Sequence, residues 1–523
     1  MGWSTKRRIV VANVVGWGLA IIGAVMIPLM EYIIKKKVED TVVIRKGGPV
    51  YEYWEDPPVP VYLQIYMFNI TNQQEFYDGQ KPSLNQVGPY TYSERRVKFN
   101  IIFNDNGTVS YRQKRIFTFL PEMSQGKESD IFLSPNPVYW ALYNALKYED
   151  PKVREAIYAA TQLFGEHPLM ARPMKELIWG YHDPLLNVTK VIDPNWFYTD
   201  YIGFFMNKNN TDDGVYTVFT GANNISALGI IDKYNGSSYL DFWTTEWANM
   251  INGSDGTLGP PYLPKSEKMY TFASDICRSV PGIFYTEVQT PQGIGLWRFG
   301  AAPDGLANVT LNPDNIGFCT PARENCLGNG VVNITRCQSV DFFHLPVAIS
   351  FPHFLFGDPR YIHGVDGINP NIEEHNTVID LEPYTGLVLQ AAKRLQINMY
   401  LEPLADVPET LKIKPVFLPV FWLNESAAID DKSSKKFFHL LFTPLLIIHV
   451  TEIVLISAGA LVLISTVIYG VWKYRLSKSF IAHGGRSDTV NDTQPIVNYD
   501  DDITADETNQ NGHPDIGQSN QVT

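Results

Sequence analysis

Three of the four cysteines lie within one short stretch, where thiols could form a metal site, a redox centre or disulfides. The stretch reads GFCTPARENCLGNGVVNITRC and contains Cys319, Cys326 and Cys337, whereas Cys277 lies further upstream. Zinc sites usually take ligands in pairs separated by roughly two to four residues. Six residues separate the first two cysteines of the stretch and ten separate the next two. This spacing does not favour a metal site.

The other groups capable of chemistry do not form a catalytic constellation. His375 follows Glu373 and Glu374 in NIEEHN, and His353 lies in FPHF. Single histidines beside carboxylates are usually hydrogen-bonding groups of the surface or core. The sequence also lacks the Gly-x-Ser-x-Gly, His-Glu-x-x-His, Walker and Gly-x-Gly-x-x-Gly motifs between its apolar ends. We therefore predict no catalytic residue, no metal and no cofactor.

Two uncharged apolar runs, at residues 9–30 and 453–472, predict transmembrane helices. At ~1.5 Å per residue, each can cross a hydrocarbon core of ~30 Å. The first run is longer than the apolar region of a signal peptide, so we interpret it as an uncleaved anchor. The formal net charge of -13 argues against nucleic acid as a partner, because phosphate binding needs clustered Lys and Arg.

Basic residues flank the first span on both sides, so the positive-inside rule does not decide which side of the membrane each end lies on. Glycosylation sequons decide it instead. Ten sequons lie between the spans, where chance would give roughly three. We therefore predict a glycosylated lumenal or extracellular ectodomain over residues 31–452, a cytoplasmic N-terminus at 1–8 and a disordered cytoplasmic tail at 473–523. The sequons begin at Asn69, Asn106, Asn187, Asn209, Asn224, Asn235, Asn252, Asn308, Asn333 and Asn424.

The oxidising compartment implied by this topology favours two disulfides among the four cysteines, and three pairings are possible. The first span carries a small-residue ridge, which allows close approach of another helix. Its partner is the second span, another copy in a homo-oligomer, or none. The ridge consists of Ala12, Gly16, Ala20 and Ala24.

Alternating apolar residues predict strands in the ectodomain, first around residues 61–68 and again around 395–401. Turn-rich connections such as NDNGT and KYNGSS indicate antiparallel neighbours. Between residues 137 and 181 the period changes and predicts three helices. The second of these helices has Asp150 as N-cap, Pro151 at its first position and Gly165 at its end. The fold class is therefore α+β, with a β-rich body and a helical cluster.

The helical cluster has more apolar surface than one buried stripe requires. These side chains either pack the helices together or form an exposed patch that contacts lipid or a protein partner. Neighbouring basic residues could contact anionic head groups, although acidic residues lie among them. The candidate ligand-binding residues are Trp140, Tyr143, Leu146, Lys147, Lys152, Arg154, Ile157, Leu163 and Phe164.

Long ordered motifs from the N-terminus to about Trp472 resemble the class B scavenger receptors. This family includes the fatty acid translocase, the high-density lipoprotein receptor and a lysosomal integral membrane protein. The motifs are DPPVPVYLQIYMFNITN, VGPYTY, ELIWGY, SDICRS, FPHFLFGDPR and DLEPYTGLVLQAAKRLQIN.

The resemblance implies a large antiparallel β-barrel-like ectodomain with an apical helical bundle and a hydrophobic tunnel toward the bilayer. Lipoprotein particles or a protein cargo would dock at the apical helices, and fatty acids, sterols or phospholipids would pass along the tunnel. The alternative function is a lysosomal cargo receptor for a soluble hydrolase. The implied disulfides join Cys277 to Cys337 and Cys319 to Cys326. The implied location is the plasma membrane, the endosome–lysosome membrane, or both.

The chain departs from the translocase branch at several positions. A ligand-contacting lysine of that branch aligns near Gly165 or Glu166, so its anionic-ligand contact is not carried over to this chain. The partners of its third disulfide align with Ala248 and Gly317, and the absence of both cysteines resembles the lysosomal branch. Neither tail contains a cysteine for palmitoylation. The tail segment DTQPIV, residues 492–497, either resembles an acidic sorting signal or is a plain linker.

Overall fold

The computed structural model describes residues 3–57, 59–147, 149–187, 199–337, 345–405 and 407–483. The chain divides into two compact units, one formed by Met1–Ala24 with Ile453–Thr523 and the other by Val25–Glu452. The tail segment at residues 492–497 lies outside the described residues.

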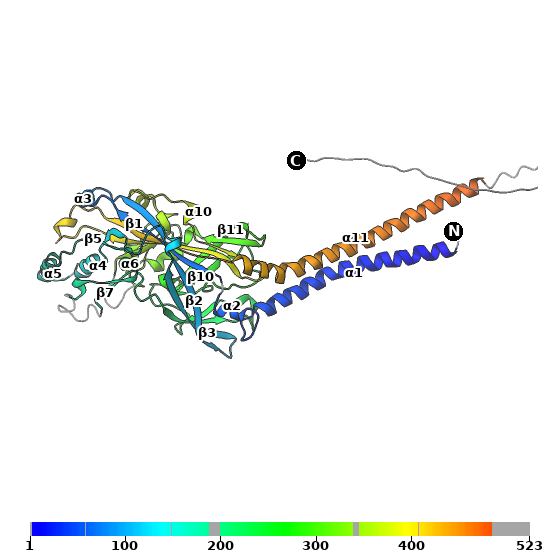
Figure 1. Ribbon diagram of the computed structural model, residues 1–523, viewed down its shortest axis with the longest axis horizontal. Coiled ribbons are helices and arrows are strands. Elements are labelled where there is room, and N and C mark those ends of the chain that lie inside the picture. The colour runs from blue at the N-terminus through cyan, green and yellow to red at the C-terminus, as the bar shows by residue number, and fades with distance from the viewer. Residues whose placement is uncertain are drawn as a thin grey trace, which may run out of the picture. The chain divides into compact units, whose positions relative to one another are not determined.

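A large antiparallel sheet dominates the unit of residues 25–452, in agreement with the predicted α+β class (Figure 1). Its main path runs β10-β11-β12-β15-β16-β17-β1-β2-β3-β8-β9, and β13 and β14 pair beside β16. The bounds of these strands are β1 Val61–Ile70, β2 Leu84–Phe103, β3 Thr108–Phe119, β8 Thr211–Phe219, β9 Ile231–Tyr234, β10 Met269–Ala273, β11 Arg278–Gln289, β12 Gly295–Ala301, β13 Val331–Asn333, β14 Val347–Ser350, β15 Val378–Leu381, β16 Val388–Leu401 and β17 Val416–Ala428.

The predicted strands are present, but only one of the two predicted turns joins neighbouring strands of the sheet. Strand β9 ends in the KYNGSS turn, across which Tyr234 forms only an isolated antiparallel bridge with Ser237. Leu63, Ile65 and Met67 are buried on one face of β1, as the alternation predicts. The NDNGT turn joins β2 to β3, which pair antiparallel. Strand β16 differs from the expectation of one polar face, because Gln396 and Asn398 are also fully buried. Their amides bond to each other at 2.7 Å, so burial on this second face leaves these polar groups satisfied.

The two end strands of the sheet path, β9 and β10, both hydrogen-bond to the segment Gly253–Ser254. The amide of Ile231 in β9 donates to the Gly253 carbonyl at 2.9 Å, and the amide of Phe272 in β10 donates to the Ser254 carbonyl at 2.9 Å. Gly253 has a positive φ of 82°, and a Cβ there would lie 1.8 Å from the Tyr270 carbonyl oxygen. Only glycine fits this approach, so the residue type makes the connection between the two edges possible.

Helices α4, α5 and α6 form the cluster predicted between residues 137 and 181. The Asp150 side chain accepts a hydrogen bond from the Lys152 amide at 2.8 Å, and Gly165 ends α5 with a left-handed φ of 67°. Both the N-cap and the terminating glycine are confirmed. The bounds of the three helices are α4 Pro137–Leu146, α5 Pro151–Phe164 and α6 Met174–Trp179.

The sequence did not predict that short strands accompany these helices. Strand β4 Ile131–Pro135 pairs with β5 Leu169–Pro173, and β6 Tyr181–His182 pairs with β7 Tyr201–Ile202. Among the described residues, the other short α-helices are α2 Tyr51–Glu55, α3 Gln73–Tyr77, α8 Glu246–Asn249, α9 Pro359–Ile362 and α10 Ile372–His375.

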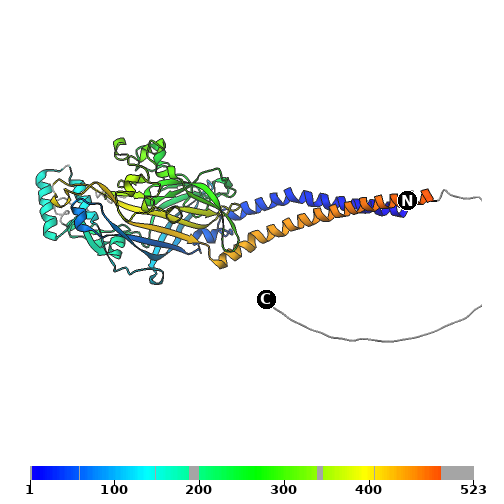
Figure 2. The same ribbon diagram turned by 90° about the horizontal axis from the view of Figure 1, so that it is seen from above.

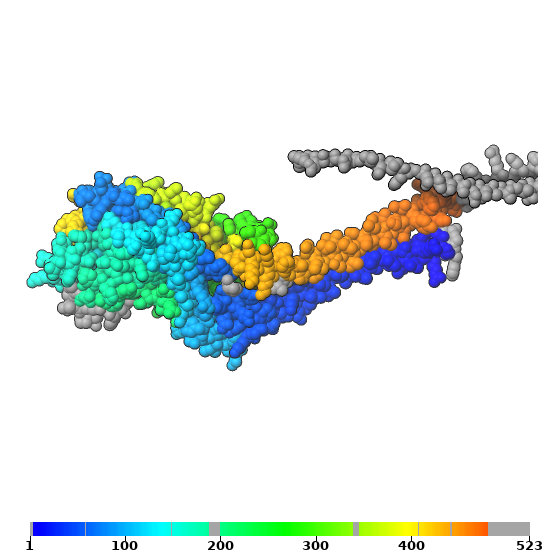
Figure 3. Space-filling view, in the orientation of Figure 1, coloured from blue at the N-terminus to red at the C-terminus, as the bar shows by residue number. Residues whose placement is uncertain are grey.

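Within the unit of residues 25–452, α4 and α5 lie at one end, and residues 25–42 and 431–452 lie at the opposite end (Figures 1 and 2). Residues of the helical cluster form much of the surface at the first end (Figure 3).

Within the part of the chain that the structure describes, two helices are long and apolar enough to cross a membrane, α1 Trp3–Val42 and α11 Asp431–His483. Helix α11 continues beyond the predicted span, so the expectation of a disordered tail from residue 473 is wrong for residues 473–483. The segment KYRLSKS consists largely of residues with good helix propensity, which extend the helix without a stop signal.

In the unit formed by the chain ends, the small-residue ridge contacts the second apolar helix. A Cβ on Gly459 would lie 2.7 Å from both the Gly16 carbonyl oxygen and the Ala20 amide nitrogen. The Thr466 hydroxyl also donates to the Asn13 side-chain oxygen at 2.9 Å. Of the three partners left open by the sequence, this geometry matches the second apolar helix of the same chain.

Candidate functional site

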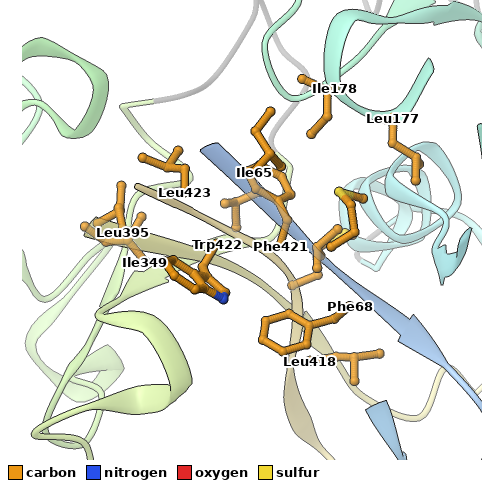
Figure 4. Close-up of a cluster of buried hydrophobic side chains, with 14 of the residues drawn as sticks. Ile65, Phe68, Leu177, Ile178, Ile349, Leu395, Leu418, Phe421, Trp422 and Leu423 are labelled. Carbon is orange, nitrogen blue, oxygen red and sulfur yellow. The ribbon is translucent and has the colours of Figure 1, made fainter. Parts of the chain in front are cut away.

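A cavity of about 310 Å³ lies inside the unit of residues 25–452. One part of its wall is apolar, because alternate residues of three neighbouring strands face it. Leu395, Phe421 and Leu423 are three of these residues, and they lie in the buried apolar cluster shown in Figure 4. The apolar lining residues are Leu63, Phe117, Phe204, Phe205, Met206, Ile276, Ile334, Leu345, Val347, Leu395, Ile397, Phe421 and Leu423.

The same strand faces continue into charged residues, which form a second part of the wall. Lys393 precedes Leu395 by two residues on β16, and Glu425 follows Leu423 by two residues on β17. Lys393 and Glu425 are direct partners in the sheet register. The charged lining residues are Glu94, Arg115, Lys208, Asp275, Lys393 and Glu425.

Ion pairs connect most of this charged wall. The Arg115 guanidinium donates to both carboxylate oxygens of Asp275, at 2.8 and 3.2 Å. The Lys393 ammonium lies 3.2 Å from Asp275 and 3.5 Å from Glu425. Arg96, next to the wall, pairs with Glu94 at 2.8 Å and also with Glu425. The paired charges offset much of the cost of placing ions inside the protein.

The pKa shifts at the centre of the network agree with this pairing. Burial alone would raise the pKa of Asp275, but the positive charges of Arg115, Lys393 and Lys208 hold it well below its ordinary value. Burial would lower the pKa of Arg115, whereas the carboxylates of Asp275 and Glu94 raise it. Asp275 and Arg115 are therefore both charged at neutral pH.

The cysteines form two disulfides, Cys277–Cys337 and Cys319–Cys326. This is the pairing that the resemblance implies. Cys337 also lines the cavity, so the longer disulfide fixes part of its wall. Ala248 and Gly317, where a third bridge would align, are neighbours: a Cβ on Gly317 would lie 2.5 Å from the Ala248 Cβ.

Comparison with known proteins identifies the family. The sequence model of the CD36 family matches residues 14–470. The chain belongs to the CD36 family. It is 34% identical to scavenger receptor class B member 1 of Sus scrofa, over 90% of this chain and 91% of that protein. It is 37% identical to lysosome membrane protein 2 of Homo sapiens, over 81% of this chain and 86% of that protein.

In this CD36-family chain, the nine candidate ligand-binding residues divide into buried and exposed groups. Trp140, Tyr143, Leu146 and Ile157 are each at most 4% exposed, so they pack the helical cluster and offer no surface to a ligand. The Trp140 indole N–H, for example, donates to the Pro168 carbonyl at 2.9 Å.

The exposed group lies mainly on α5 and beside it. Leu163 is 80% exposed and Phe164 is 44% exposed. Lys147 and Lys152 are exposed, and the Lys147 ammonium pairs with Glu402 at 2.9 Å. Arg154 is half-buried and donates to the Glu149 carbonyl at 2.8 Å. Leu163 and Phe164, at the end of α5, are thus the clearest candidates among the nine residues for contact with a lipid or protein ligand.

Glu166, aligned near the lysine of the translocase branch, has a structural contact. Its carboxylate accepts a hydrogen bond from the Asn136 side chain at 2.7 Å, and Asn136 in turn caps α4. This contact orients the loop after α5 toward the start of α4.

The sequence interpretation missed the charged wall, although a local signal for it exists. Lys393 lies two residues before Leu395, so it is on the same strand face as the apolar stripe predicted from Leu395 to Leu401. A charge in register with an apolar strand face marks a polar group that points toward the interior. Arg115 before Phe117 and Glu425 after Leu423 carry the same signal.

Proposed function

We propose that this chain is a membrane receptor that binds lipids or lipoprotein particles and passes lipid through the interior of its ectodomain. The cavity carries this proposal. Its volume of about 310 Å³ is at the lower end of the range for small-ligand sites, and most of its lining is apolar. Moving a lipid chain between a particle and such a cavity keeps apolar surface away from water, at ~25 cal/mol per Å².

The proposed architecture is a closed barrel with an apical helical bundle. The hydrogen bonds of β9 and β10 to Gly253–Ser254 support closure of the sheet. The position of α4 and α5 at the end opposite residues 25–42 and 431–452 supports an apical location. The proposed tunnel would extend from the cavity toward the bilayer.

The proposed topology has spans at residues 9–30 and 453–472, both termini in the cytoplasm and the glycosylated ectodomain at 31–452. Cell-surface and endosome–lysosome membranes are both compatible with it. Imaging the full-length chain with and without residues 492–497 tests whether that segment directs the protein to lysosomes. We do not extend the proposal to a hydrolase cargo, since none of the described contacts favours one.

Filling the cavity tests the proposed function. Leu423→Trp should block lipid uptake from labelled particles while particle binding to the cell surface persists, because Leu423 lines the cavity and α5 is unchanged. Leu411→Trp is the control, since Leu411 is 54% exposed. Cell-surface abundance shows whether each variant folds, and Val347→Phe is a milder cavity filler. Normal lipid uptake by both folded cavity variants would contradict the proposal.

Particle binding has its own test at α5. Phe164→Asp and Leu163→Asp should weaken binding, because each places a charge on an exposed apolar surface without disturbing the core. Tyr143 is unsuitable for this test, since it is buried and a charge there would unfold the cluster. Unchanged particle binding by the double variant would place the docking surface elsewhere.

A further inference from the structure

Helix α11 exposes an apolar stripe before the predicted second span. Leu446 is 61% exposed and Val450 is 50% exposed. The segment around them, residues 437–451, contains no Asp, Glu, Lys or Arg. Residues four apart lie on one face of a helix, so the stripe continues to Val454, which is 57% exposed inside the predicted span. The face that hydrocarbon covers in the proposed topology therefore begins about two turns before residue 453.

Lipid is the occupant that this continuity favours, because hydrocarbon already covers the same helix face in the proposed span. A contiguous exposed apolar surface marks a protein or membrane contact. The carboxylate that follows the stripe, that of Glu452, does not face outward: the residue is 4% exposed, and its Oε2 lies 3.2 Å from the His449 Nδ1. A buried and paired charge is compatible with this depth. The longer span, by ~10 Å, is accommodated when the helix tilts.

The first apolar helix brings one surface loop to the level of the lipid head groups. The uncharged run of α1 ends at Met30, and Lys35, Lys36 and Lys37 follow as exposed residues. At ~1.5 Å per residue, Lys35 lies ~7 Å beyond the end of the run, and a head-group layer is roughly 5 to 7 Å thick. The Lys35 ammonium lies 5.6 Å from the ring centroid of Tyr262. Tyr262 therefore lies at the outer limit of this layer.

The loop that carries Tyr262, residues 259–264, reads GPPYLP. The Tyr262 amide donates to the Pro383 carbonyl at 3.0 Å, which fixes the loop to a neighbouring turn. The ring of Tyr384, which is 45% exposed, lies edge-on to that of Tyr262 with centroids 6.2 Å apart. Tyrosine rings beside lysine side chains are typical of a membrane interface, where the ring contacts apolar atoms and the polar tip contacts water or head groups.

We propose that the non-cytoplasmic leaflet reaches the end of the unit of residues 25–452 from which α1 and α11 emerge. Hydrocarbon covers the stripe of Leu446 and Val450, and the loop around Tyr262 rests among the head groups. The inference rests on the proposed topology, because it sets the depth of the same two helices. This end of the unit lies opposite α5 (Figures 1 and 2), so the apical helices face away from the membrane.

Fluorophores on single introduced cysteines test this depth. All four native cysteines are in disulfides, so a thiol-reactive bimane labels the introduced residue alone. Full-length protein with Leu446→Cys is placed in nanodiscs with or without lipids that are brominated near the carboxyl end of their acyl chains. Bromine quenches a fluorophore on contact, so the label should lose emission in the brominated discs. Val450→Cys provides the same measurement if Leu446→Cys does not fold.

Two exposed apolar residues serve as controls. Val25→Cys lies inside the predicted first span and should lose emission, whereas Leu163→Cys, on α5 at the opposite end of the unit, should not. Emission that is unchanged at Leu446 and Val450 but lost at Val25 would overturn the inference and leave the proposed topology intact. A second copy that covered the stripe would give this result. Unchanged emission at Val25 as well would refute the topology itself.

The loop has a separate test with a lipid that carries a nitroxide on its head group. A bimane on Leu263→Cys, next to Tyr262, should lose more emission with this lipid than with the chain-brominated lipid. Leu163→Cys is again the control and should be unaffected by either lipid. Equal emission from the Leu263→Cys label with and without the nitroxide would show that the loop stands clear of the head groups, and would overturn its place in the contact.

Discussion

A buried pair of histidines should make the unit of residues 25–452 less stable in acid. The rings of His353 and His375 stack with centroids 4.3 Å apart, and the residues are 6% and 3% exposed. The Nδ1 of His353 accepts a hydrogen bond from the Asn369 amide at 3.0 Å, and the Nδ1 of His375 accepts one from the Asn371 amide at 2.9 Å. Both Nδ1 atoms act as acceptors, so both rings are in the neutral form.

Burial lowers the pKa of His353 to about 3, with a further contribution from His375. Burial also lowers the pKa of His375 to about 4, with a contribution from Arg394. Unfolded histidine titrates near ~6.5. Because the folded pKa values are the lower ones, the unfolded state binds protons first as the pH falls. The stability that the neutral pair provides is therefore fully present above pH ~6.5 and decreases below it.

The loss of unfolding free energy at pH 5 depends mainly on the pKa of histidine in the unfolded state. Both folded values lie below 5, so each histidine contributes ~1.4 kcal/mol per pH unit over ~1.5 units, or about 2 kcal/mol. The pair should therefore remove about 4 kcal/mol of unfolding free energy between pH 7.5 and 5.0. Asp183 acts in the opposite direction, since burial, with the charge of Glu166, raises its pKa to about 6. Comparison with a variant cancels this second effect.

The assay is urea unfolding of the full-length protein in detergent at pH 7.5 and 5.0. Trp422 provides a local fluorescence signal, since its ring lies 5.6 Å from that of His375. The double variant His353→Gln/His375→Asn should lose about 4 kcal/mol less stability on acidification than the wild type. His363→Asn is the control at an exposed site and should behave as the wild type. Equal losses for the double variant and the wild type would refute the reasoning.

Three further predictions concern other parts of the molecule. Asp275→Asn should lower the unfolding free energy by about 3 kcal/mol, because it leaves Arg115 and Lys393 with one fewer carboxylate; an unchanged urea midpoint would mean that the network is not stabilising. Gly459→Leu should separate the apolar helices, so that a disulfide between Asn13→Cys and Thr466→Cys forms in the parent chain but not in the variant; formation in both would show that the helices tolerate the added side chain. Ala248→Cys with Gly317→Cys should form a disulfide that thiol titration detects. It should raise the free energy of unfolding by less than the upper limit of about 4 kcal/mol, because the two Cβ positions are closer together than an unstrained disulfide requires. Two free thiols would show that this segment cannot shift.

The sequence predicted those features that depend on neighbours along the chain. Asp150, Pro151 and Gly165 define the ends of α5 by local capping chemistry, and the structure has these ends. The alternation in β1 likewise identified the buried residues, because side-chain direction in a strand has a period of two.

Features that depend on distant segments could not be predicted in this way. The alternation of side chains along a strand shows that Lys393 and Leu395 share a face. It does not show that the Asp275 carboxylate lies 3.2 Å from the Lys393 ammonium. The burial of Gln396 and Asn398 depends on β14, which pairs with β16. The exposure of Leu163 and burial of Trp140 depend on how the three helices pack. Such contacts follow from tertiary pairing, which a single sequence does not contain.

The connection of β9 and β10 through Gly253–Ser254 has a consequence for biosynthesis. Ser254 is 8% exposed and is the hydroxyl residue of the sequon that begins at Asn252. A glycosyltransferase needs an accessible sequon, so we predict that a glycan can be attached to Asn252 only before the two edges join. Once joined, neither strand offers a free edge there to another chain, and pairing between copies is prevented. We therefore predict that the order of glycan attachment and edge closure decides whether Asn252 carries a glycan, and that closure protects the newly made protein from aggregation through these edges.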